Sequence, residues 1–168
     1  MTATSPRAAD TTQLTTPNPS PRRLIMLAMV VLGLCCAGAA VALYQHLPDG
    51  ATHAVDARRP WHEFIAADGG TAMSPPLPIM VLFAAAIAAC ASHRWIGIVG
   101  AVAVAIGGIA FTVGMAVEPV TRQVLSTHPD AVKTPLAVLA LVAAPVTAVT
   151  AILHVRLRLK ALRPRSGR

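Results

Sequence analysis

The chain has 168 residues, of which 55% are hydrophobic and only 12% charged. Soluble domains carry about 25% charged residues, so this composition is typical of a membrane protein and argues against a soluble globular one. The formal charge of +7 does not indicate nucleic acid, because the basic residues gather beside apolar runs, where they orient helices and attract anionic lipid.

The first apolar run covers residues 24–44 and follows a tail, 1–21, whose Thr-, Pro- and Ser-rich composition predicts disorder. Arg22 and Arg23 precede the run, so the pattern also resembles a signal peptide. Its 21 uncharged residues exceed the usual apolar region of such signals, about 7–15 residues. We expect a retained transmembrane helix, with cleavage as the alternative.

A long polar connection, 45–73, follows the first span. Within it Trp61, Phe64 and Ile65 are spaced so that they share one face of a short helix, which we expect to lie at the membrane surface. The second span is predicted at 75–92. We expect Ser74 to cap it, because a hydroxyl followed by prolines is typical of a helix start.

The third span is predicted at 96–117, where 22 residues carry no charge. At about 1.5 Å per residue the run is about 33 Å long, enough to cross a hydrocarbon core of about 30 Å. One helix through both the second and third spans would be far too long, so the chain must turn at His93 and Arg94. Trp95 then serves as an interfacial anchor.

A polar connection, 118–134, leads to the fourth span, predicted at 135–153 with Thr134 as its cap. Pro145 predicts a kink, because proline has no N–H to donate to the carbonyl four residues before it. A helix bundle tolerates such a proline where a threonine or a neighbouring helix donates to that carbonyl. The basic tail, 156–168, alternates Arg or Lys with apolar residues. This pattern favours an interfacial extension of the helix.

The basic residues also predict the orientation. Ten of the fourteen lie on the side of the two tails and the turn at residues 93–94, and the positive-inside rule places that side in the cytoplasm. The predicted fold is therefore an all-α membrane protein. It is a four-helix transmembrane bundle over residues 22–155, with both termini cytoplasmic and outer loops at 45–73 and 118–134.

Small residues recur four apart in several predicted spans, a spacing that lets helices approach closely in a bilayer. The sets are Gly97, Ala101 and Ala105; Gly100 and Gly108; Ala110 and Gly114; Ala84 and Ala88; Gly33 and Ala37. They indicate a compact bundle and leave open self-association through the third span.

All three cysteines, Cys35, Cys36 and Cys90, lie inside predicted spans. We interpret them as small packing residues, since no spacing typical of a disulfide framework or a zinc site is present.

Histidines on the expected outer side could bind copper or zinc, with Glu63 and Met73 nearby. These are His46, His53, His62 and His128. Their spacing matches no metal motif, so we predict no metal ligand and no cofactor, and outer-side copper or zinc handling stays an alternative.

Catalytic features are scarce. No Asp, Glu, Lys or Arg falls within a predicted span, which argues against an ion-coupled transporter. We expect His93 and His154 to be hydrated at helix ends. Asp56 and Glu63 are kept from pairing on one helix by the intervening Pro60. No nucleophile or phosphate-loop motif occurs, so we predict no catalytic residue and no enzyme.

These observations favour a non-enzymatic accessory or interaction subunit. An excess of Arg over Lys and abundant Ala indicate a bacterial origin, and hence the plasma membrane. The expected partners are anionic lipid at the basic tail and another membrane protein or a second copy of the chain. The alternatives are an oligomeric pore or holin-like protein, and an outer-side copper or zinc handling protein.

Overall fold

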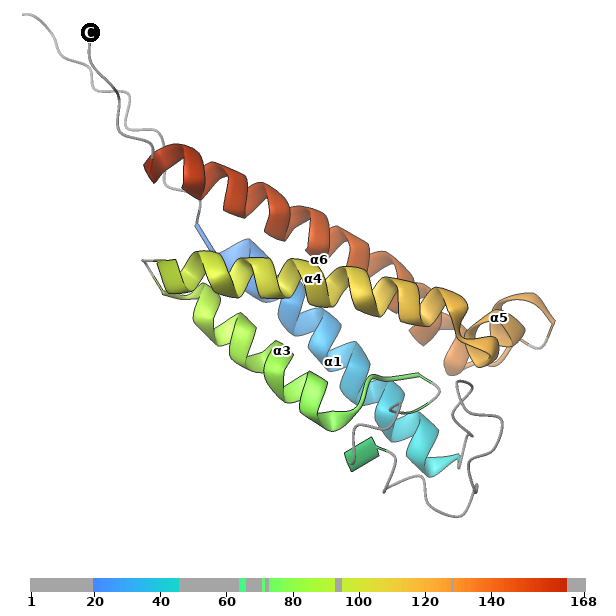
Figure 1. Ribbon diagram of the computed structural model, residues 1–168. Helices are drawn as coiled ribbons and strands as arrows, with labels where there is room; N and C mark the ends of the chain where they lie inside the picture. Colours follow the sequence, from blue (N-terminus) through green and yellow to red (C-terminus); the bar gives the residue numbers. More distant parts are fainter. Residues whose placement is uncertain are drawn as a thin grey trace, which may run out of the picture.

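The computed structural model describes residues 20–45, 64–65, 71, 73–92, 95–127 and 129–162. The described part is helical, with one isolated bridge between Thr71 and Ser74 and no strand (Figure 1). Its helices are α1 (Arg22–Tyr44), α3 (Leu77–Cys90), α4 (Trp95–Val117), α5 (Pro119–Ser126) and α6 (Lys133–Leu162). The predicted all-helical class is confirmed.

Three helices are long and apolar enough to cross a membrane: α1 and α4 with 23 residues each and α6 with 30. At about 1.5 Å per residue they measure about 35, 35 and 45 Å. The second predicted span, 75–92, is shorter than expected, because α3 has only 14 helical residues and is about 21 Å long.

Four helices pack alongside one another in alternating directions (Figure 1). α4 packs against α3 and α6, and α1 packs against α6 and α3. The start of α1, the end of α3, the start of α4 and the end of α6 lie together at what we call the turn end. The short helix α5 and the start of α3 lie at the other end, which we call the α5 end.

Small residues let α4 pack this closely. A Cβ at Gly100 would lie 2.8 Å from the carbonyl oxygen of Ala86 in α3, and one at Gly108 would lie 3.0 Å from the carbonyl oxygen of Ala144 in α6. Ala101 and Ala105 are buried on the same helix. Two of the predicted small-residue sets of the third span, Gly97, Ala101 and Ala105 and the pair Gly100 and Gly108, therefore pack against neighbours within the chain, whereas Ala110 and Gly114 are exposed.

The start of α3 differs from the prediction. Ser74 does not cap the helix; Pro76, with an extended ψ of 151°, precedes the first helical residue, Leu77. Ser74 and Pro75 each stand before a proline, and that position disfavours helical backbone. The Ser74 hydroxyl instead donates to the Pro75 carbonyl and to the Met80 sulfur.

The connection predicted at 118–134 contains a helix, α5, that the sequence reasoning missed. Thr121 and Val124 are buried on its inner side, and Val120 is partly buried beside them. α5 packs against α4 and α6. A proline in its first turn and valines four apart were the available signal.

α6 starts two residues earlier than expected, at Lys133, and Asp130 is its cap rather than Thr134. The Asp130 carboxylate accepts the N–H groups of Val132 and Lys133, both at 2.9 Å. These bonds, chiefly that from Lys133, hold the pKa of Asp130 below its usual value. The Thr134 hydroxyl accepts the Asp130 N–H.

α6 continues through Pro145 to Leu162, so the first part of the basic tail is helical, as predicted. The carbonyl freed by Pro145 belongs to Leu141. The nearby Thr147 hydroxyl donates to Ala143 instead, so it does not supply the expected compensation.

Two smaller expectations need correction. Phe64 is buried whereas Ile65 is 57% exposed, so these two do not share one face; Trp61 lies outside the described residues. Cys35 and Cys90 are buried as expected of packing residues, but Cys36 is exposed. Trp95, the first residue of α4, is 65% exposed.

Candidate functional site

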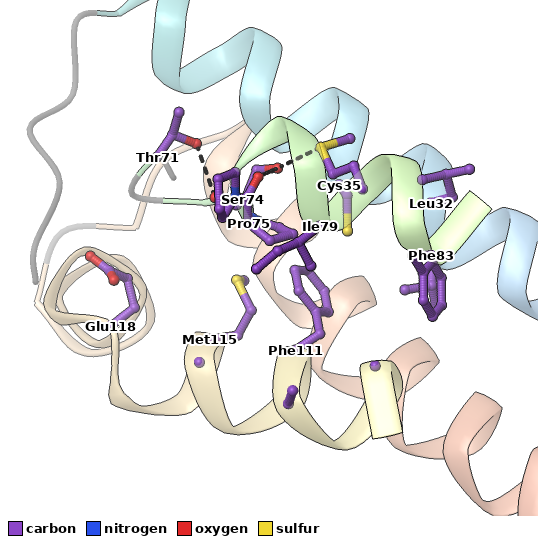
Figure 2. Close-up of a pocket in the computed structure, with 16 residues that line it drawn as sticks. Leu32, Cys35, Thr71, Ser74, Pro75, Ile79, Phe83, Phe111, Met115 and Glu118 are labelled. Carbon is purple, nitrogen blue, oxygen red and sulfur yellow. Dashed lines mark hydrogen bonds between the residues drawn. The ribbon is translucent and has the colours of Figure 1, made fainter. Parts of the chain in front are cut away.

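A groove of about 270 Å³ lies between α1, α3 and α4 (Figure 2). It lies where α3 and α4 diverge away from the turn end (Figure 1). α1 contributes Val31, Leu32 and Cys35; α3 and the segment before it contribute Thr71, Ser74, Pro75, Pro76, Ile79, Met80 and Phe83; α4 and the residue after it contribute Gly107, Ala110, Phe111, Gly114, Met115 and Glu118.

One face of α4 forms a wall of the groove. Gly107, Ala110 and Gly114 follow one another at helical spacing on it, and their lack of bulk leaves the hollow. A Cβ at Gly114 would meet nothing within 4 Å. At Gly107 the space is closed, because a Cβ there would lie 2.7 Å from the ring of Phe83. The Phe83 ring therefore closes one end of the groove.

The floor of the groove is apolar and its side is open. Val31, Cys35 and Met80 are buried beneath it. The exposed residues along the opening are Ile79 on α3, which is 51% exposed, and Ala110 and Gly114 on α4. If these helices cross a bilayer, the opening faces the hydrocarbon rather than water.

Polar groups gather only at the α5 end of the groove (Figure 2). Thr71 and Ser74 pair through two backbone bonds, of 2.8 and 3.2 Å. Glu118 is partly exposed immediately after α4. Arg122 follows one turn later, and its Nε donates to the Ala116 carbonyl at 3.0 Å, which holds the side chain over the end of α4.

A buried polar cluster at the turn end was missed by the sequence reasoning. Arg158 is only 8% exposed, and its Nη1 donates to the Ser92 carbonyl at 3.0 Å. This bond ties α6 to the end of α3, where helix carbonyls lack backbone partners. His154 is 5% exposed, so its expected hydration is wrong. Neither His154 Nε2 nor Arg158 Nε has a hydrogen-bond partner in the described structure.

The hypothesis of an outer metal site is not tested, because most of its residues lie outside the described part of the chain. These are His46, His53, His62, Glu63 and His128, and the same holds for Asp56 of the excluded carboxylate pair. Met73 is described and is 3% exposed, packed among apolar side chains. Among the described residues no three His, Cys, Asp or Glu side chains come together.

No protein-family model matches the chain, and neither a curated protein nor a solved structure matches it.

Proposed function

We propose that this protein is a multi-pass, non-enzymatic accessory or interaction subunit of the bacterial plasma membrane. It packs through an exposed helix face against another membrane protein. Both ends of the chain are cytoplasmic, so the turn end faces the cytoplasm and the α5 end faces outward. The charge distribution along the sequence supports this orientation, because ten of the fourteen basic residues belong to the two tails and the turn at residues 93–94.

In this proposal α3 crosses the bilayer together with the extended residues before it. Three extended residues add about 10 Å to the 21 Å of the helix, which reaches about 30 Å. Unsatisfied backbone N–H groups are costly at membrane depth. Pro75, Pro76 and Pro78 have no N–H, which makes this short helix compatible with a crossing.

The observation that carries the proposal is the outward face of α1. Gly33, Ala37 and Ala40 are exposed along it, and a Cβ at Gly33 would meet nothing within 4 Å. In a bilayer such small residues let a second helix approach closely. The buried residues of α1, Leu24 and Ala28 among them, belong to the core, which supports retention of this segment rather than cleavage.

The pore alternative is less well supported. The small residues of α4 that would have driven self-association, Gly100 and Gly108 among them, are buried against α3 and α6. The exposed Thr150 donates its hydroxyl to the Val146 carbonyl of its own helix. A water-filled channel needs polar groups along its lining, and the exposed faces of α4 and α6 consist mainly of apolar side chains.

The proposal is tested by affinity purification of the C-terminally tagged full chain in a mild detergent, followed by mass spectrometry of intact species. We expect a stoichiometric protein partner that is lost on Gly33→Leu and kept on the matched Gly114→Leu, which also fills open space but on α4. The intact mass also reports whether α1 is retained.

Two results would overturn the proposal. One is a partner-free monomer, and the other is a partner held equally by Gly33→Leu. A homogeneous homo-oligomer that causes dye leakage from cells would establish the pore alternative instead.

A further inference from the structure

We propose that the turn end binds one phosphate group between the guanidinium of Arg158 in α6 and the first turn of α4, with His154 as a further hydrogen-bond donor. The phosphate comes from a lipid headgroup or from a free anion, and the same contacts serve both. The site goes beyond the proposed function and does not depend on it, because it lies at the end of the bundle and away from the outward face of α1.

Arg158 uses only part of its guanidinium within the chain. Its Nη1 donates to the Ser92 carbonyl at 3.0 Å, whereas its Nε is buried and has no hydrogen-bond partner in the described structure. Nε and the neighbouring Nη2 carry parallel N–H groups, which bind two oxygens of one phosphate at the same time. The edge of Arg158 suited to a bidentate anion is therefore the edge on which Nε is unpaired.

The charge of Arg158 has no acidic neighbour in the part of the chain that the structure describes. The side chain is only 8% exposed, and a buried cation is costly unless an anion compensates it. The two acidic residues within the described ranges, Glu118 and Asp130, lie at the α5 end. At about 1.5 Å per residue, α4 and α6 separate them from Arg158 by at least about 30 Å. A bound phosphate would supply the compensating negative charge.

The first turn of α4 lies against the same guanidinium. A Cβ at Gly97 would lie 2.7 Å from Arg158 Nη1 and would clash with the Ser92 carbonyl oxygen, so this approach requires glycine. The first four N–H groups of a helix have no partner within it and carry the positive end of its dipole. Such a helix start binds phosphate readily, and here it lies beside a cation.

His154 supplies a donor from the preceding turn of α6. Its side chain is 5% exposed, and among the described residues its Nε2 has no hydrogen-bond partner. Residues four apart lie on the same side of a helix, so His154 and Arg158 face the same neighbours. A neutral imidazole with its proton on Nε2 donates to a phosphate oxygen. One phosphate group would therefore satisfy two buried polar atoms.

The level of the site suits both sources of phosphate. α3 ends at Cys90 and α4 begins at Trp95, so in a bilayer the site lies at the boundary between hydrocarbon and water. The phosphates of lipid headgroups lie at this boundary, and soluble anions reach it from the water.

The test uses the purified full chain, stripped of lipid in detergent, and two separate probes. Dioleoyl phosphatidylglycerol is titrated by native mass spectrometry, with dioleoylglycerol as the control lipid that has the same chains and no phosphate. Inorganic phosphate is titrated by its effect on melting temperature, against chloride at equal ionic strength. We expect at least one probe to bind in a ratio of one to one, and the lipid to bind more tightly than dioleoylglycerol if it is the source.

Arg158→Lys keeps the positive charge but removes the bidentate edge, so it should weaken binding of that probe at least about tenfold. Arg156→Lys is the matched control, because it makes the same change at an exposed position of the same helix and should bind like the wild type. His154→Leu should also weaken binding, which guards against one variant that fails to fold.

Binding of the lipid alone would assign the phosphate to a headgroup, and binding of inorganic phosphate would assign it to a free anion; both results support the site. Two results would overturn it. One is a wild-type chain that binds neither probe, and the other is equal affinity in Arg158→Lys and Arg156→Lys. Failure of the proposed function shows separately, in the Gly33→Leu pull-down.

Discussion

The tight contact of α4 with its neighbours yields a graded prediction from three Gly→Ala substitutions in one helix. The space available to a new Cβ decreases from Gly114, where nothing lies within 4 Å, through Gly108, with a nearest atom at 3.0 Å, to Gly100, with three atoms at 2.8 Å. Two of the three atoms near Gly100 are the Ala86 carbonyl oxygen and the Cys90 nitrogen, which cannot move without their helix.

The expected magnitude follows from that crowding. Overpacking a well-packed site costs about 1–3 kcal/mol in unfolding free energy. Gly→Ala also improves helix propensity, by up to about 1 kcal/mol, and Gly114→Ala isolates this gain. For a chain of this size 1 kcal/mol shifts Tm by about 2–4 °C. Because both variants share the propensity gain, they differ by the overpacking cost alone, and we expect Gly100→Ala to melt about 2–12 °C below Gly114→Ala, with Gly108→Ala between them.

The assay uses the cysteines. Cys90 is 1% exposed beside the Gly100 contact, so a thiol-reactive fluorophore reaches it when α3 separates from α4. A Cys36→Ser background removes the exposed thiol. Melting is followed in detergent by fluorescence for the three variants in this background. A melting temperature of Gly100→Ala equal to or above that of Gly114→Ala would refute the packing argument.

Two further predictions concern the helix ends. Arg158→Met removes the bond to the Ser92 carbonyl and leaves that acceptor unpaired, which should lower the free energy of unfolding by about 1–3 kcal/mol. We therefore expect the fluorophore to label Cys90 at a lower temperature than in the wild type. Unchanged labelling would mean that the bond contributes nothing to stability. Asp130 has a lowered folded pKa, so its cap on α6 should be fully present above the ordinary carboxyl pKa of 3.8 and lost as pH falls through the lowered value. Hydrogen exchange of the first turn of α6 should accelerate over that acidic window in the wild type but show no such step in Asp130→Asn. The same step in both chains would assign it to another group.

The long apolar helices could be predicted from the sequence because each helix that crosses a bilayer needs an uninterrupted run of about 20 apolar residues. α1 and α4 fall within two residues of the predicted bounds, 24–44 and 96–117. The start of α3 was placed too early because consecutive prolines keep the backbone extended before they admit a helix. α5 was missed because eight residues with few apolar positions resemble a loop.

The groove and the buried Arg158 could not be predicted, since both depend on how helices far apart in the sequence meet. Alternating basic and apolar residues in the tail indicated an interfacial extension of the helix, yet Arg158 is buried and donates to a carbonyl 66 residues away in the sequence. Nothing local to α6 specifies that neighbour. The groove likewise requires Gly107 and Gly114 of α4 to lie opposite Phe83 and Ile79 of α3.

Glycine positions show why a small-residue motif alone does not identify an interface. Gly100 and Gly108 are filled from within the chain, whereas Gly33 and Gly114 face open space. A small-residue motif shows only that another helix can approach closely at that position. Whether a helix of the same chain already packs there depends on the fold. The two open glycines lie on different helices, Gly33 on the outward face of α1 and Gly114 in the groove beside α3, so the same substitution at each tests two different surfaces.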